Sequence, residues 1–193
     1  MNIFYIDKDP VKAARMQCDK HVVKMALESA QILCTAHRVL DGKPYVQQNL
    51  GLGGRRTTHY RLDDTRENIL YKTNFINHPC NVWCRESKQN YDWLYEHFKA
   101  LCMEYKRRYN KEHTSWIKLG ATLYWAPKKI YNIGITPHAL AFKDFYDTCL
   151  VEGDPVKSYQ NYYISKMHKF KMVWTNAKIP EFLNEHRHLL TQA

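Results

Sequence analysis

The chain has 193 residues, with 29 Lys+Arg against 19 Asp+Glu and a formal net charge of +10. This length suffices for one ordinary domain that closes a core without disulfides. Aromatic residues make up 13% of the chain and only 7 glycines and 7 prolines occur, so the composition argues against disorder. No apolar run approaches the roughly 20 residues of a membrane span, and the first residues lack a signal-peptide pattern. We therefore expect a folded cytoplasmic protein without a membrane partner.

The positive charge is spread over the whole length rather than gathered in one tail. Such a charge favours a polyanionic partner, with DNA or RNA first, because binding to phosphates releases counterions. A basic protein without such a partner is the alternative. The six cysteines fall mostly inside helical patterns, which is typical of small buried apolar residues, so we expect no disulfides.

The first part of the chain carries one clear helix start. Asp9 offers an N-cap acceptor and Pro10 suits the first helical position, whereas Asp41 and Gly42 favour an end. In chain order, these signals predict a helix from Asp9-Pro10 to about Leu40, a glycine-rich basic loop over 43–62, and a short helix from Asp63 or Asp64 through Tyr71.

Further proline-marked starts divide the second part. The pattern predicts a long helix from Asn77-His78-Pro79 to about Lys111 with a possible break near Ser87 to Asn90, a short helix ended by Pro127, a segment beginning at Thr136-Pro137, a helix launched by Asp154-Pro155, and a terminal helix from Pro180. Apolar and polar residues rarely alternate at every second position, as they would in β-strands. The predicted class is therefore all-α: a compact single domain, 1–193, of helices with long loops.

A line of polar residues runs along the first predicted helix. His21, Lys24, Glu28 and Gln31 are spaced by three, four and three positions, so they share one face. A polar line beside an apolar one is usually the solvated edge of an amphipathic helix, and spacing alone favours that interpretation. The alternative is the wall of a site.

Three further clusters allow two interpretations each. His78 with Cys80 and Cys84 suggests a metal site, but the spacing is not that of a zinc site, and a helix N-cap or phosphate contact fits His78 better. The tyrosines Tyr159, Tyr162 and Tyr163 stand among lysines, which suits base stacking as well as core packing. The segment "GLGGRR" lacks the ending of a phosphate-binding P-loop, so it is either a surface loop or a loop that orders on DNA.

Three segments, taken in order, carry a resemblance. The first is "CDKHVVKMALES", in which Asp-x-His is followed by Glu28; the second is "YKTNFINHPCNVW" leading into "NYDWLYEHFKALCMEYKRRYN"; the third is "TPHALAF" followed by "DPVKSYQNYY". Together they resemble the phage pyrimidine-dimer DNA glycosylase (endonuclease V) family. Compared with that family, 43–62 is a loop insertion and about 165–193 is a C-terminal helical extension.

The resemblance implies a DNA glycosylase with abasic-site lyase activity, acting on duplex DNA with damaged or modified pyrimidines by nucleotide flipping. The N-terminal amine would attack the deoxyribose and Glu28 would be the catalytic carboxylate. An α-amine with a reference pKa of about 7.7 to 8.0 is a ready nucleophile near neutrality. The amine belongs to Met1, or to Asn2 after removal of Met1, with Lys24 as a substitute, and His21 is the second catalytic candidate.

The same resemblance and the charge together nominate a DNA-contacting set. It comprises Lys24, Arg55, Arg56, Arg61, His78, His138, Lys157, Tyr159, Tyr162, Tyr163 and Lys166. Where the family has arginines beside its glutamate, this chain has Leu27 and Gln31, so the resemblance leaves the lesion open while it implies the reaction class.

We expect a monomer without metal or cofactor, in the cytoplasm or nucleoid of a bacterial host cell. Two alternatives remain at this point: a non-catalytic nucleic-acid-binding protein of the same fold, and a metal-dependent nuclease built on His78.

Overall fold

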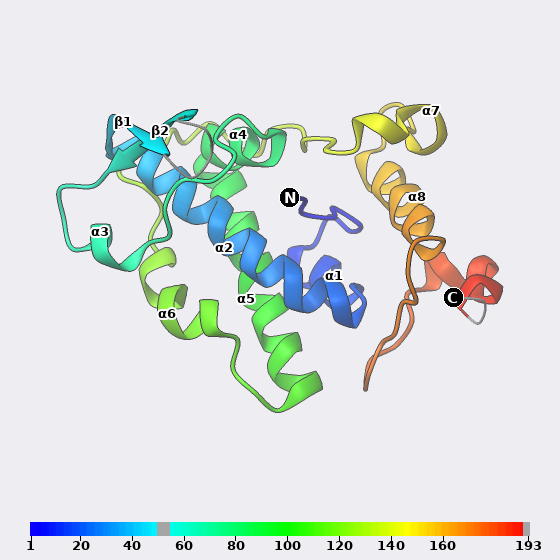
Figure 1. Ribbon diagram of the computed structural model, residues 1–193. Coiled ribbons are helices and arrows are strands. Elements are labelled where there is room, and N and C mark those ends of the chain that lie inside the picture. Colours follow the sequence, from blue (N-terminus) through cyan, green and yellow to red (C-terminus); the bar gives the residue numbers. More distant parts are fainter. Residues whose placement is uncertain (50–54, 191–193) are drawn as a thin grey trace.

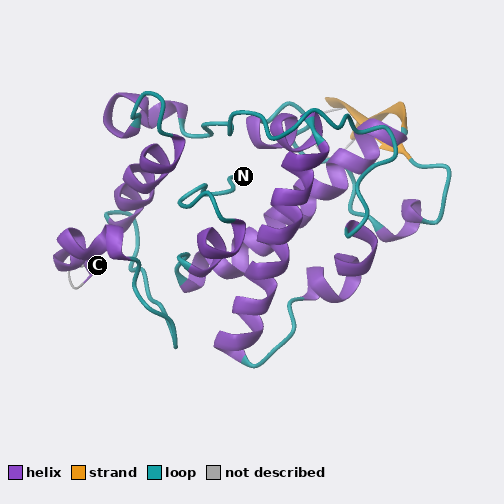
Figure 2. Cartoon of the chain, turned by 180° about the vertical axis from the view of Figure 1, so that it is seen from behind, coloured by secondary structure: helices purple, strands orange, loops and turns teal. Residues whose placement is uncertain are grey.

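The computed structural model describes residues 1–49 and 55–190, and Figures 1 and 2 show it from opposite sides. Its elements are α1 (Pro10–Arg15), α2 (Asp19–Asp41), β1 (Lys43–Asn49), β2 (Arg55–Arg61), α3 (Arg66–Ile69), α4 (Pro79–Glu86), α5 (Lys88–Tyr109), α6 (Thr114–Leu123), η2 (Lys143–Phe145), α7 (Tyr146–Cys149), α8 (Pro155–Met167) and η3 (Glu181–Leu190). The prediction of a mainly helical fold is confirmed. The fold is not purely α-helical, however, because it includes the two strands β1 and β2.

Lys43–Asn49 and Arg55–Arg61 form two paired strands, so the prediction of a loop was wrong for these residues, and the glycines of "GLGGRR" lie outside the described residues. The strands β1 and β2 pair antiparallel, from Lys43 opposite Arg61 to Asn49 opposite Arg55. The hairpin lies at one end of the molecule, away from α7 and α8 (Figure 2). Its base is fastened to α2, because a guanidinium nitrogen of Arg38 donates to the Tyr60 carbonyl at 3.0 Å. Both faces of the hairpin carry polar residues, so its sequence lacks the alternation of apolar and polar residues from which a half-buried strand is predicted.

The predicted helix from Asp9 to about Leu40 is interrupted between α1 and α2. The carbonyls of Arg15 and Gln17 accept hydrogen bonds from Arg108 at 3.1 and 2.8 Å. The Cys18 amide donates to the hydroxyl of Tyr163 at 2.8 Å. These tertiary partners replace the bonds that a continuous helix would supply, and no glycine or proline marks the break.

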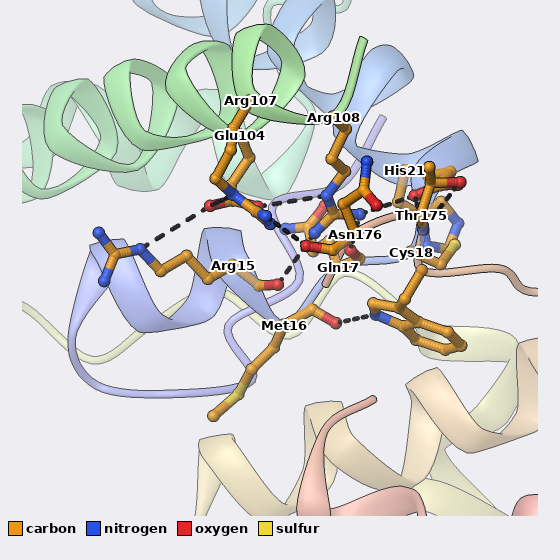
Figure 3. Close-up of polar contacts among 12 residues, drawn as sticks. Arg15, Met16, Gln17, Cys18, His21, Glu104, Arg107, Arg108, Thr175 and Asn176 are labelled. Atoms are coloured by element: carbon orange, nitrogen blue, oxygen red, sulfur yellow. Dashed lines mark hydrogen bonds and ion pairs between the residues drawn. The ribbon is translucent and has the colours of Figure 1, made fainter. Parts of the chain in front are cut away.

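A buried ionic network lies beneath this turn (Figure 3). The Arg108 side chain is fully buried and reaches Asp19 Oδ1 at 3.0 Å and Glu104 Oε2 at 3.2 Å. Asp19 also accepts from the hydroxyl of Thr175 at 2.6 Å. The indole of Trp174 donates to the Met16 carbonyl at 2.9 Å. The network therefore connects α5, the α1–α2 turn and the segment after α8.

One hydrophobic cluster extends from Ile3 to Leu183. Helices α2 and α5 cross at its centre, and the N-terminal residues enter it between α2 and α8 (Figure 1). All six cysteines are buried free thiols, as their place in helical patterns predicted. No helix among the described residues is long and apolar enough to cross a bilayer.

The capping signals that the sequence predicted are confirmed at several helix starts. Asp9 accepts from the Val11 and Lys12 amides, and Asp154 accepts from the Lys157 amide. The predicted break falls at Ser87, whose hydroxyl caps α5. Helix α8 ends at Met167, and a stretch without helix or strand precedes η3.

Four buried histidines make the fold sensitive to acid. Burial lowers the pKa of His21, His97 and His138 to about 3, and that of His37 to about 4. Between these values and the unfolded pKa of about 6.5, the unfolded chain binds more protons, so stability is complete above pH 6.5 and falls as the pH drops. Each ring contributes a slope of about 1.4 kcal/mol per pH unit in that window.

We therefore expect the free energy of unfolding, measured with urea, to fall steeply between pH 7 and pH 5. Replacing the buried ring by His97→Phe should reduce the slope, because one titrating group is removed while the stack on Trp93 is kept. The matched control is His168→Gln, at an exposed position. Equal slopes for His97→Phe and the parent protein would contradict this account.

Candidate active site

The first residues turn inward to meet α2. Phe4 has a φ of 56°, in the left-handed region that costs a non-glycine residue about 1–3 kcal/mol. The Asn2 side chain stabilises this turn: its oxygen accepts from the Phe4 amide at 2.9 Å, and its nitrogen donates to the Ala141 carbonyl at 3.1 Å. The turn directs Met1 and Asn2 towards the middle of α2.

The Glu28 carboxylate lies beside the first two backbone nitrogens. Oxygen Oε2 accepts from the Asn2 amide at 3.0 Å and lies 3.8 Å from the amine of Met1. The other oxygen is 3.6 Å from Nζ of Lys24. The Glu28 side chain is only 12% exposed, whereas that of Lys24 is 67% exposed. The carboxylate is thus held between an α-amine and a lysine.

His21 belongs to the interior rather than to a solvated edge. Its Nδ1 lies 2.8 Å from the Tyr163 hydroxyl, and its ring centroid is 4.5 Å from that of Phe4. Burial lowers its pKa to about 3, helped by the positive charges of Lys24 and Lys166. The neutral ring shares this hydrogen bond with Tyr163, whose hydroxyl also accepts from the Cys18 amide. Among the polar residues that share this face of α2, Lys24 is the one that faces solvent. The interpretation of that face as a solvated helix edge therefore holds for Lys24 but not for His21.

A pocket of about 290 Å³ opens at this point. Its N-terminal wall includes Met1, Asn2, Phe4, His21, Lys24 and Glu28, and its C-terminal wall includes Ala141, Tyr162, Lys166, Lys169 and Phe170. Nζ of Lys166 lies 4.1 Å from the ring centroid of Tyr162. Burial and the charge of Lys24 lower the pKa of Lys166. Three lysines and one carboxylate line this pocket, which is an arrangement suited to an anionic ligand.

His78 approaches the same amine from α4. Its Nδ1 accepts from the Cys80 amide at 3.2 Å, so the predicted N-cap is confirmed. Its pKa is lowered by burial and by the positive N-terminus, while Glu28 opposes the shift. Cys80 and Cys84 are fully buried. Among the described residues, no three His, Cys, Asp or Glu side chains lie together in a way that could hold a metal ion, so the hypothesis of a nuclease metal site at His78 lacks its ligand set.

Four residues of the predicted DNA-contacting set are buried: Tyr159, Tyr163, His138 and Tyr162. Tyr159 and Tyr163 have no exposed surface, and His138 is packed between aromatic rings. The Tyr159 hydroxyl donates to the Ala139 carbonyl at 2.7 Å and accepts from the Ala141 amide at 3.1 Å. Since Ala141 holds Asn2, these rings support the pocket from behind. In this structure they offer no face to a base, and Tyr162 is the member of the tyrosine cluster that lines the pocket.

The remaining predicted contacts lie outside the pocket. Arg56 and Arg61 are exposed on β2, and Lys157 is exposed at the start of α8. Arg55 begins β2, but its side chain lies outside what the structure describes. Sequence reasoning missed Lys169 and Phe4 as pocket residues. The position of Lys169, three residues after Lys166, was an available signal, whereas nothing local marks Phe4.

Comparison with known proteins identifies one family. A family model described as pyrimidine dimer DNA glycosylase matches residues 1–118. No curated protein and no solved structure matches. The matched span contains Met1, His21, Glu28 and His78, whereas Lys166 and the rest of the C-terminal wall lie beyond it.

The Tyr163 hydroxyl is expected to stabilise the pocket wall. Tyr163→Phe removes the acceptor of the buried Cys18 amide and the hydrogen-bond partner of His21 Nδ1. Leaving such groups unsatisfied costs about 1–3 kcal/mol, so the urea midpoint should fall accordingly at pH 7.5. Tyr131→Phe, at an exposed ring, is the control and should leave the midpoint in place. A Tyr163→Phe protein as stable as its parent would mean that the hydroxyl carries no structural role.

Proposed function

The chain belongs to the pyrimidine dimer DNA glycosylase family, and on that premise we propose that it removes a damaged or modified pyrimidine from duplex DNA and then cleaves the strand by β-elimination. The observation that carries the proposal is the contact of Glu28 with the first two backbone nitrogens, at 3.0 and 3.8 Å, in a lysine-lined pocket. The family description names the glycosylase step; the lyase step and the residue roles are our proposal.

In the proposed first step, the unprotonated α-amine attacks C1′ of the deoxyribose. The new N–C1′ bond forms as the bond from C1′ to the base breaks, and the base leaves with the electron pair. The amine nitrogen then loses a proton to Glu28, and the C1′–O4′ bond breaks with its electron pair going to O4′, which takes up that proton; the product is a protonated imine between the chain and C1′. Glu28, returned to its carboxylate form, stabilises the positively charged imine, a role that its position beside the nitrogen supports.

In the second step, a proton leaves C2′ and the C3′–O bond breaks, so the 3′ phosphate departs with the bonding pair. Hydrolysis of the remaining imine returns the free amine. Glu28 is the carboxylate available for these transfers as well. Burial lowers the pKa of His21 to about 3, so the ring is neutral at pH 7 and acts as a hydrogen-bonding wall rather than as a proton donor.

The site geometry serves either form of the N-terminus. With Met1 retained, its amine lies 3.8 Å from Glu28 Oε2. Removal of Met1 would place the new amine on the Asn2 nitrogen, which already lies 3.0 Å from the same oxygen. Because the Asn2 side chain is anchored to Ala141 and to the Phe4 amide, its position does not require Met1. Lys24 is the third candidate nitrogen, at the other carboxylate oxygen.

Recognition is assigned to the cationic side of the pocket. Lys24, Lys166 and Lys169 line the pocket together with one carboxylate, so a DNA phosphate can be neutralised beside the reacting sugar. The exposed arginines Arg56 and Arg61 extend the positive surface along the hairpin. Extruding the target nucleotide costs a few kcal/mol, which such phosphate contacts would offset.

Borohydride trapping on DNA with an abasic site tests the mechanism. The parent protein should give a covalent adduct, and Glu28→Gln should lower its rate about 100-fold or more, in line with the contribution of a positioned acid–base group. Acetylation of the α-amine should abolish the adduct, whereas Lys24→Arg should not. Glu96→Gln, at an exposed carboxylate of α5, is the matched control.

An adduct that survives both Glu28→Gln and acetylation would overturn the assignment. No adduct at all, together with salt-sensitive binding, would favour the alternative of a non-catalytic nucleic-acid-binding protein, since the three pocket lysines suit binding alone. Mass analysis of the N-terminus in the adduct would tell Met1 from Asn2.

Lys166 should contribute one phosphate contact. Lys166→Gln is expected to weaken duplex binding for all sequences and to reduce the slope of log K against log salt by about 1. Lys178→Gln is the control, because Lys178 lines a separate depression of about 860 Å³ that shares no residue with the pocket. Equal salt slopes for Lys166→Gln and the parent protein would remove Lys166 from the phosphate contacts.

A further inference from the structure

Phe75 combines two unfavourable features at one position. Its side chain is 67% exposed, whereas rings such as Tyr91 and Phe98 are fully buried. Its φ of 45° lies in the left-handed region, which a bulky side chain rarely adopts. Neither feature stabilises the isolated protein, and backbone strain of this kind gathers at functional sites.

The surrounding structure holds the backbone of Phe75 firmly in this conformation. The Phe75 carbonyl accepts from the His78 amide at 2.8 Å and from the Asn81 side chain at 3.0 Å. The same Asn81 nitrogen donates to the Asn74 carbonyl at 2.9 Å, and Arg85 donates to the Ile76 carbonyl at 2.7 Å. Asn81 is buried. The exposed ring is therefore carried by a fixed base rather than by a loose loop.

This base adjoins the candidate active site. The Asn81 nitrogen that holds Phe75 also lies 3.3 Å from Sδ of Met1. His78, which holds the Phe75 carbonyl, feels the charges of both the N-terminal amine and Glu28. One short segment thus connects the exposed ring to the nitrogen proposed as nucleophile.

We propose that Phe75 enters the base stack of duplex DNA beside the pocket and fills the space left by the extruded nucleotide. The inference rests on the proposed function, because an extruded nucleotide is what creates the gap. An apolar ring inserted between base pairs unstacks them and lowers the cost of keeping a nucleotide outside the helix. The lysines of the pocket hold the adjacent backbone, so the ring and the cations act on the same stretch of duplex.

The exposed ring of Trp125 lacks this connection. Trp125 is 72% exposed and follows α6, but none of its described contacts reaches a pocket residue. Trp125 therefore serves as a control for the loss of an exposed ring as such.

The test compares Phe75→Ala, Phe75→Leu and Trp125→Ala on three substrates. These are a duplex with a cyclobutane thymine dimer, a duplex with an abasic site opposite 2-aminopurine, and a single strand with an abasic site. We expect Phe75→Ala to lower base release from the dimer duplex at least 10-fold and to abolish the rise in 2-aminopurine fluorescence on binding. Phe75→Leu should restore part of both, and Trp125→Ala should behave as the parent protein.

Borohydride trapping on the single strand separates this inference from the proposed function. A single strand has no stack to open, so Phe75→Ala should trap at the parental rate there. Parental behaviour of Phe75→Ala on both duplexes, or an equal loss on duplex and single strand, would overturn the role of Phe75. Absence of an adduct with the parent protein would overturn the proposed function instead. In that case the 2-aminopurine fluorescence on duplex binding, compared between the parent protein and Phe75→Ala, would still show whether Phe75 enters the base stack. A thermal midpoint for each variant checks that the fold is intact.

Discussion

The buried Arg108 guanidinium sets the geometry on which the candidate site depends. It is held by the carboxylates of Asp19 and Glu104 and caps the carbonyls that end α1. Removing one partner of such a network leaves an uncompensated buried charge, at a cost of about 3–5 kcal/mol. Because α2 begins at Asp19, its start is fixed against α5 at this point. The helix then delivers Glu28 to the N-terminal nitrogens about two and a half turns later.

The second constraint is the inward turn of the N-terminal residues. Phe4 adopts a left-handed conformation, and its ring packs on His21 and Tyr163. Asn2 is held from the other side by Ala141, which Tyr159 supports in turn. The strain at Phe4 is therefore balanced by packing and hydrogen bonds from α2, α8 and the segment between them. Asn2 and Ala141, which are more than a hundred residues apart in the sequence, have to come together before the Glu28 carboxylate can contact the N-terminal amine.

Local signals in the sequence predicted much of the helical framework. Asp9, His78 and Asp154 cap the helices as expected because a cap depends on a few neighbouring residues. The break after Arg15 could not be predicted in this way, since Arg108 and Tyr163 cause it from distant parts of the chain. The hairpin was missed for a related reason: its pairing is stabilised across strands and against Arg38, while its own sequence is polar on both faces.

The same difference between local and tertiary causes applies to the candidate site. Spacing placed His21, Lys24 and Glu28 on one face of a helix, but it could not tell which of them would be buried. In the structure His21 joins Phe4 and Tyr163, Lys24 faces solvent, and Glu28 lies between them. Tyr159 and Tyr163 share a helical pattern with Tyr162, yet only Tyr162 reaches the pocket. A period of 3.6 residues predicts which side chains lie together, whereas the packing partner decides which of them face inward.

The two walls of the pocket come from different parts of the chain, and this bears on what the protein recognises. The wall within the matched span supplies the proposed chemistry, through Glu28 and the N-terminal nitrogens. The wall beyond it supplies Lys166 and Lys169, from the end of α8 and the residues that follow. On α2 itself, Leu27 and Gln31 stand where the family resemblance leads one to expect arginines. If the proposed function holds, the cations that face the sugar and its phosphates approach mainly from the α8 side. A change in lesion preference would then follow from the C-terminal wall, while the reaction class follows from the N-terminal one.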